Sequence, residues 1–264
     1  MADPSSFIDK FARIGYSAKA LIYLTIASLA AESAISGGGK DADAKSSLET
    51  LGAQPWGWVI LGALLIGLIC YVIWRFVATF AANTGDKDGV QAIAERIGRF
   101  VSGLTYVGLA YAVVRLLSGE GSGAENGTGE AASKTMSQPM GEWLVILLGL
   151  IVLGVGVHFL YRSFTASYRK KFTVTEGSET LRTWVDRSAR IGIAARGFVF
   201  LLIGGFLVIA GWQSDASEAK GMGGALQFLH DQAYGSILLG FMAIGLAAYA
   251  IYCFVRARYG HIKT

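Results

Sequence analysis

Apolar residues along this chain gather in six long blocks separated by polar links. The blocks cover residues 18–35, 56–80, 100–118, 143–164, 193–212 and 234–255. Each is close to the roughly 20 residues that a helix needs to cross the hydrocarbon of a bilayer. Continuous apolar runs of this length predict helices rather than short alternating strands. The pattern therefore predicts an all-α polytopic membrane protein with six transmembrane helices.

A three-residue motif, which we call the entrance motif, precedes the first, third and fifth blocks. It occurs as Arg13-Ile14-Gly15, Arg96-Ile97-Gly98 and Arg190-Ile191-Gly192, and Lys19, Ser102 and Arg196 follow it at one common offset. The later block of each pair also repeats a spacing, as Gly62, Gly67 and Tyr71, then Gly149, Gly154 and His158, then Gly240, Gly245 and Tyr249. These matches predict three tandem helical hairpins, residues 7–80, 90–165 and 181–258, within one membrane domain. Because all three cross in the same direction, we expect parallel repeats in a pseudo-threefold six-helix bundle.

The repeated positions have roles that follow from their place at a membrane. We expect the arginine of each entrance motif, together with Lys19 and Arg196, at the level of the lipid headgroups, where cations pair with phosphate. The entrance glycines allow another helix or a headgroup to approach, and the six later glycines are expected to pack helices closely. An amphipathic stretch before each motif predicts a short interfacial helix. Trp74, Tyr161 and Tyr252 are expected in an aromatic belt.

Composition and charge add the orientation. The chain is 53% hydrophobic and 16% charged, whereas soluble domains carry about a quarter charged residues. Most of its 23 Lys and Arg residues lie in the N-terminal segment, the two links between hairpins and the C-terminal segment. The positive-inside rule therefore places both termini in the cytoplasm, and it explains the basic side without nucleic acid. Anionic lipids of the inner leaflet are the expected partners.

With these motifs in view, the chain resembles an uncharacterised bacterial membrane family, the domain-of-unknown-function family 1206. That family is similar in having tandem two-helix repeats, each opening with Arg, an aromatic or aliphatic residue, and Gly. The resemblance runs from Phe11 to about Arg258, and it implies a multi-pass protein of the bacterial plasma membrane. It implies no activity. One departure is Cys253, which stands where the first two repeats have Arg75 and Arg162.

Three ionisable residues are candidates for a polar pathway: Glu32, Arg115 and His158. Glu32 and Arg115 follow their entrance arginines at the same offset, so they lie at equivalent heights. Ionisable residues near membrane depth are functional candidates by default. Glu32 and Arg115 either form an ion pair or reach separately to the outer surface. His158 either relays protons or is a hydrogen-bonded residue in a position that holds tyrosine in the other repeats.

The sequence contains no recognisable catalytic constellation, phosphate loop or metal-ligand motif. We therefore expect neither an enzyme nor a cofactor or metal site. Two functions stay open: a small transport- or channel-like bundle, or a non-catalytic accessory or scaffold subunit that binds a membrane-protein partner or a second copy. Polar residues and tyrosines on the bundle axis would favour transport. An axis filled by aliphatic side chains would favour the subunit.

Overall fold

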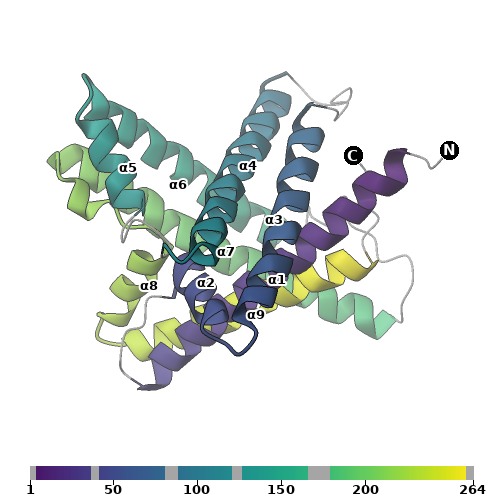
Figure 1. Ribbon diagram of the computed structural model, residues 1–264. Helices are drawn as coiled ribbons and strands as arrows, with labels where there is room; N and C mark the ends of the chain where they lie inside the picture. Colours follow the sequence, from purple (N-terminus) through teal and green to yellow (C-terminus); the bar gives the residue numbers. More distant parts are fainter. Residues whose placement is uncertain (1–3, 37–41, 81–88, 121–126, 166–178, 260–264) are drawn as a thin grey trace.

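The computed structural model describes residues 4–36, 42–80, 89–120, 127–165 and 179–259 (Figure 1). Every regular element within these ranges is helical, which confirms the predicted all-α fold. The elements are α1 (Pro4–Ser36), α2 (Ala44–Gly52), α3 (Gly57–Phe80), α4 (Gly89–Leu117), α5 (Gly127–Met136), α6 (Gly141–Thr165), α7 (Glu179–Gln213), η2 (Ala216–Glu218), α8 (Met222–His230) and α9 (Gly235–Tyr259).

Each repeat consists of a long helix, a short helix and a second long helix. The short helices α2, α5 and α8 occupy the links within the predicted hairpins. They are polar at their exposed faces: Lys134 of α5 pairs with Glu130 at 2.7 Å, and it lowers the pKa of that carboxyl. The three repeats are therefore copies of one helical unit rather than of a simple hairpin.

Among the described residues, five helices are long and apolar enough to cross a membrane. They are Lys10–Ser36, Gly57–Phe80, Gly141–Thr165, Thr183–Gln213 and Gly235–Tyr259. In α4 the apolar segment found among the described residues, Ser102–Leu117, is shorter. The molecule is a membrane-embedded helical protein, and the sixth crossing remains a prediction.

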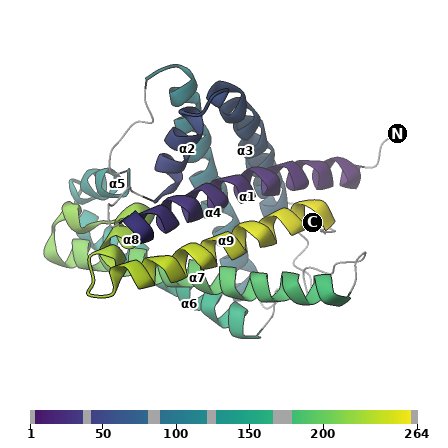
Figure 2. The ribbon, with the colours of Figure 1, turned by 90° about the horizontal axis from the view of Figure 1, so that it is seen from below.

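The long helices follow a cyclic order. The second long helix of each repeat packs on the first long helix of the next, as α3 on α4, α6 on α7 and α9 on α1. Both views show α3 beside α4 and α6 beside α7, with α1 and α9 running together (Figures 1 and 2). Within repeats 1 and 3 the two long helices also pack, as α1 on α3 and α7 on α9. In repeat 2, α4 and α6 do not pack in this way in their described parts, so the pseudo-threefold ring has one open side.

Small residues decide which helix pairs come close. A Cβ atom at Gly67 would lie 2.5 Å from the Cβ of Ala18, and one at Gly245 would lie 2.4 Å from that of Ala195. Gly154 is the equivalent residue of repeat 2, and a Cβ there would meet nothing within 4 Å. The equivalent glycines therefore allow close helix packing in repeats 1 and 3, whereas repeat 2 stays open.

Of the other glycines predicted to pack helices, Gly149 lies in a close helix contact, and Gly62 and Gly240 do not. Gly149 lies against Val208 and the Gly204 carbonyl in the α6–α7 contact, where a Cβ would come within 2.8 Å of Val208. Gly62 and Gly240 face open space, since a Cβ at either would meet nothing within 4 Å. Close packing through small residues thus holds at Gly67, Gly149 and Gly245.

The amphipathic stretches before the entrance motifs do not form separate helices. Helix α1 runs unbroken from Pro4, α4 from Gly89 and α7 from Glu179, each through its entrance motif. The prediction of short interfacial helices was therefore wrong. The physical reason is that the glycines at Gly15 and Gly192 serve close helix packing, and they do not end a helix there.

Candidate functional site

Six polar and charged side chains meet between the repeats, and we call them the cation–tyrosine cluster. They are Lys19 and Tyr23 of α1, Tyr71 of α3, Tyr106 of α4, Arg196 of α7 and Tyr249 of α9. Lys19 is only 5% exposed, and the four tyrosines are buried or half-buried. The cluster therefore joins five long helices from all three repeats.

Lys19 is surrounded by tyrosine rings. Its Nζ donates a hydrogen bond to Tyr71 Oη at 3.4 Å. The same Nζ lies 5.3 Å from the ring centroid of Tyr71 and 5.4 Å from those of Tyr106 and Tyr249. A cation within about 6 Å of a ring face is attracted by the ring quadrupole. Aromatic faces and one hydroxyl thus replace water around this ammonium group.

Arg196 is also surrounded by aromatic rings and bonded to a tyrosine hydroxyl. Its Nη1 donates to Tyr249 Oη at 2.5 Å, and its Cζ lies 4.6 Å from the centroid of that ring. The guanidinium also lies 5.3 Å from the Tyr23 centroid, and Lys19 Nζ lies 5.9 Å from it. Lys19 and Arg196 therefore share two tyrosine rings, Tyr23 and Tyr249, and form one site.

Equivalent positions of the repeats build this site. Lys19 and Arg196 follow their entrance motifs at the same offset, and Tyr71 and Tyr249 occupy the same position of the second long helix. Ring contacts complete it: Tyr23 and Tyr249 have centroids 4.8 Å apart, and Tyr71 and Tyr106 have centroids 4.5 Å apart. Residues from repeats 1 and 3 dominate, and repeat 2 contributes Tyr106.

The entrance glycines position the tyrosines. A Cβ atom at Gly15 would lie 2.6 Å from the Cβ of Tyr71, and one at Gly192 would lie 2.5 Å from the Cα of Tyr249. In repeats 1 and 3 the first long helix thus crosses the second at the backbone of the tyrosine, Tyr71 or Tyr249, that contacts the cations. The surroundings of Gly98 lie outside the described part of the structure.

Gly192→Ala is expected to destabilise the protein by about 1–3 kcal/mol, because the added methyl group must push α9 away from α7 at Tyr249. Thermal unfolding of the purified protein in detergent measures this change. Gly205→Ala is the matched control on α7, since a Cβ there meets nothing within 4 Å. Equal unfolding temperatures for the two variants would contradict the close crossing at Gly192.

Neither cation has an acidic partner among the described residues. The ion pairs among the described residues involve other side chains, such as Arg115 with Glu120 and Lys220 with Glu218. Buried charges are normally paired, because desolvation of a lone ion is unfavourable by several kcal/mol. Two cations held together by rings and hydroxyls leave a net positive charge inside the bundle. This arrangement can attract an anion.

The sequence analysis expected Lys19 and Arg196 beside lipid headgroups, and the structure instead places both between helices. The entrance arginines lie farther out: Arg13 is half-buried, whereas Arg96 and Arg190 are exposed. Ser163 of α6 donates to the Arg190 carbonyl at 2.8 Å. The signal that pointed to the site was the shared offset of Lys19 and Arg196 in the repeat alignment.

The predicted polar-pathway residues do not join the cation–tyrosine cluster. Glu32 is exposed near the end of α1, and His158 is exposed on α6. Arg115 Nε lies 3.5 Å from the Glu120 carboxylate. The pairing of Glu32 with Arg115 stays a hypothesis, and neither lies among the rings that surround Lys19.

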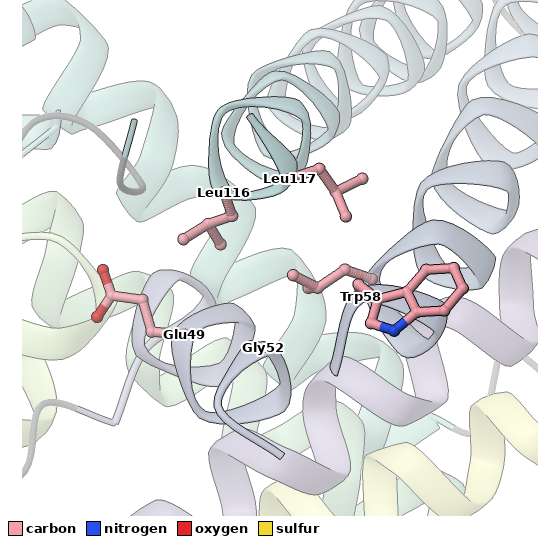
Figure 3. A pocket seen from close by; sticks show the side chains of 6 residues that line it. Glu49, Gly52, Trp58, Leu116 and Leu117 are labelled. Carbon is pink, nitrogen blue, oxygen red and sulfur yellow. The ribbon is translucent and has the colours of Figure 1, made fainter. Parts of the chain in front are cut away.

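A separate pocket of about 290 Å³ lies between α2, α3 and α4 (Figure 3). It is lined by Glu49, Gly52, Trp58, Leu61, Leu116 and Leu117. The Glu49 carboxylate lies 3.9 Å from Lys45 Nζ, and the other lining side chains are apolar. In the described ranges no three metal-ligating side chains gather in one place. The pocket offers little polar chemistry, so the cation–tyrosine cluster is the stronger candidate.

Comparisons with known proteins agree with the threefold repeat. The chain is similar to the uncharacterized protein YxxB of Bacillus subtilis (strain 168), with 30% identity over 258 residues, which cover 97% of this chain and 92% of that protein. No solved structure matches the chain significantly. The model of the family described as Domain of Unknown Function (DUF1206) matches three times, at residues 14–82, 97–166 and 191–260. These three matches take in the three structural repeats and most of the chain, which therefore belongs to the DUF1206 family.

Proposed function

We propose that the protein is a small transport- or channel-like bundle that handles small anions in the bacterial plasma membrane. The observation that carries this proposal is the position of the buried Lys19 and the half-buried Arg196 on shared tyrosine rings, with no carboxylate partner for either among the described residues. Ionisable groups inside membrane bundles are rare, and they commonly mark ion and substrate paths. The cation–tyrosine cluster is the binding point of such a path.

The energetics of the cluster support binding that is reversible. Contacts between a cation and a ring contribute about 0.5–2 kcal/mol each, depending on desolvation. They offset part of the desolvation of the two cations, whereas a buried carboxylate would neutralise one of them permanently. An incoming anion therefore meets a site that is still positive. A path needs binding of this kind, favourable enough for the ion to arrive and weak enough for it to leave.

The open side of repeat 2 supports a change of conformation. Repeats 1 and 3 close by crossing an entrance glycine over a tyrosine, at Gly15 with Tyr71 and at Gly192 with Tyr249. Repeat 2 carries Gly98 and His158 at the corresponding sequence positions. Packing of α4 on α6 in the same manner would bring His158 toward the axis and would change access to the cluster. Such rocking of one repeat against the others is a known route to alternating access.

The membrane arrangement is part of the proposal. With α4 as the sixth crossing, the first turn of α1 and the last turn of α9 lie at one end of the molecule (Figure 1). The excess of Lys and Arg on that side favours a cytoplasmic location for both termini. Anionic lipids of the inner leaflet would surround the entrance arginines, and the proposed role requires no catalysis.

Reconstituted liposomes test the proposal. Purified full-length protein is expected to pass radiolabelled chloride or phosphate faster than empty liposomes do, and to leave sodium excluded. Lys19→Gln and Arg196→Gln are each expected to lower the anion flux at least about tenfold, because a hydrogen bond to a charged group contributes 1.5–3 kcal/mol. Arg258→Gln is the matched control, since Arg258 is exposed on the last turn of α9. Absence of flux above empty liposomes, or flux that is equal in all variants, would refute anion transport.

A second candidate function, an accessory subunit, is favoured by the surface of α6. Only 17% of the apolar stretch of α6 is buried inside the bundle, against 39% to 67% in the other four candidate spans. A partner protein would cover α6 and the open side of repeat 2. Purification from native membranes in mild detergent, followed by native mass measurement, distinguishes the two functions. A stoichiometric partner would favour the subunit, and a monomer or homo-oligomer would favour transport.

A further inference from the structure

A second group of side chains lies beside the cation–tyrosine cluster, toward the end of the molecule that holds both termini. It consists of Tyr16 of α1, Trp74 and Arg75 of α3, and Tyr252 and Arg256 of α9, and we call it the arginine–tryptophan cluster. The sequence analysis placed Trp74 and Tyr252 in an aromatic belt at the membrane surface. In the structure Trp74 is only 5% exposed and Tyr252 only 4%, so both face other helices.

Tyr16 lies at the centre of this cluster. The Cζ of Arg256 lies 4.6 Å from the Tyr16 ring centroid, and the ring of Trp74 lies 5.5 Å from it. The Cζ of Arg75 lies 5.4 Å from the Trp74 ring centroid. Two arginines from different helices are thus held around one buried aromatic core.

Three buried donors in this cluster have no hydrogen-bond partner in the part of the chain that the structure describes. They are Trp74 Nε1, Arg75 Nε and Arg256 Nε. The indole and guanidinium groups are donors only, so a group that satisfies them must be an acceptor. Nearly all buried polar groups in folded proteins are hydrogen-bonded, and an exception calls for an explanation such as an absent ligand. Arg256 Nη1 does donate to Tyr252 Oη at 3.4 Å, which orients the guanidinium but leaves its Nε unused.

We propose that the arginine–tryptophan cluster binds a phosphate group, either as the free ion or as the headgroup of a phosphomonoester lipid. Two fixed guanidinium groups match the charge of a phosphate dianion, and their planar arrays of N–H groups match its several acceptor oxygens. Trp74 Nε1 supplies a further donor. Arg256 lies in the last turn of α9, and Arg75 lies just before the last turn of α3, a depth that both a dissolved ion and a lipid headgroup reach. This binding goes beyond the proposed transport and does not depend on it.

Thermal unfolding and lipid retention test this site and separate the two sources of phosphate. Full-length protein in phosphatidylcholine nanodiscs is heated in phosphate and in chloride at equal ionic strength. In parallel, native mass spectrometry counts phosphatidic acid and phosphatidylcholine molecules retained from a mixed bilayer. A phosphate-specific rise in unfolding temperature indicates the free ion, and preferential retention of phosphatidic acid indicates the headgroup. If neither is seen, the proposal is wrong.

Variants connect the effect to the named side chains. Arg75→Gln and Arg256→Gln are each expected to weaken phosphate or phosphatidic acid binding at least about tenfold, because each removes a charge-assisted hydrogen bond. Trp74→Phe keeps both charges and an aromatic ring, removes the N–H donor together with part of the indole, and is expected to weaken binding severalfold. The controls are Arg258→Gln and Trp58→Phe, at positions that are exposed. Binding that is unchanged in the first three variants, or equally weakened in the controls, would overturn the assignment. Binding without anion flux would refute the proposed function alone.

Discussion

Gly235→Ala is expected to destabilise the protein by more than about 3 kcal/mol, at the upper end of what overpacking produces. A Cβ atom at this position would lie 1.7 Å from the backbone oxygen of His230, and a carbonyl cannot move aside as a flexible side chain can. Gly235 N–H donates to the Gln232 carbonyl at 2.8 Å and closes the turn between α8 and α9. The apparent unfolding temperature in detergent is expected to fall by roughly 6–12 °C.

Gly240→Ala provides the control on the same helix. A Cβ there meets nothing within 4 Å, so the substitution is expected to be neutral or to stabilise α9 by up to about 1 kcal/mol through helix propensity. If the two variants unfold at the same temperature, the turn does not require glycine. The equivalent glycines of the other repeats lie equally close to a carbonyl oxygen. A Cβ at Gly57 would lie 2.0 Å from the Gly52 oxygen, and one at Gly141 would lie 1.9 Å from the Thr135 oxygen.

Lys19→Met is expected to raise the stability of the protein by about 1–3 kcal/mol and to abolish its anion flux. Methionine keeps the volume of the buried side chain and removes a charge that has no acidic partner, and exchanges of buried charges for apolar groups are often stabilising. Residues that serve binding frequently reduce the stability of the fold that carries them. Thermal unfolding at low ionic strength, paired with the liposome flux assay, measures both effects on one preparation.

Lys10→Met serves as the control for this substitution, because Lys10 is exposed on the same helix. The free energy of unfolding of this variant is expected to change by less than about 0.5 kcal/mol, as for most surface substitutions. A loss of stability in Lys19→Met would mean that the ammonium group holds the helices together through its rings. Lys19 would then be a structural residue, and the argument for an anion path would lose its main support.

Repeat 2 differs from its neighbours at two positions that the other repeats use in the cluster. It carries Ser102 where the other repeats have Lys19 and Arg196, so it brings no cation to the axis. It carries His158 at the position of Tyr71 and Tyr249, and His158 is exposed on α6. The threefold repeat of the sequence thus becomes a ring with two closed units and one open unit.

The sequence by itself determined the membrane class, the all-helical fold and the three repeats. Hydrophobic blocks of bilayer length and fixed offsets between motifs are local properties, and they do not depend on how helices meet. The predicted contacts at Gly67 and Gly245 follow from the same repeat, because small residues allow helices to approach wherever they pack.

Only the tertiary structure decided where the cations lie. The residues Lys19 and Arg196 are far apart in the chain, and each alone resembles a cation near a helix end that reaches toward lipid phosphate. They share the rings of Tyr23 and Tyr249 because α9 packs on both α1 and α7. Hydropathy reports how apolar a helix is and not which of its faces meets a neighbour. The convergence of two cations, and the unsatisfied donors of Trp74, Arg75 and Arg256, arise from helix contacts that no local pattern encodes.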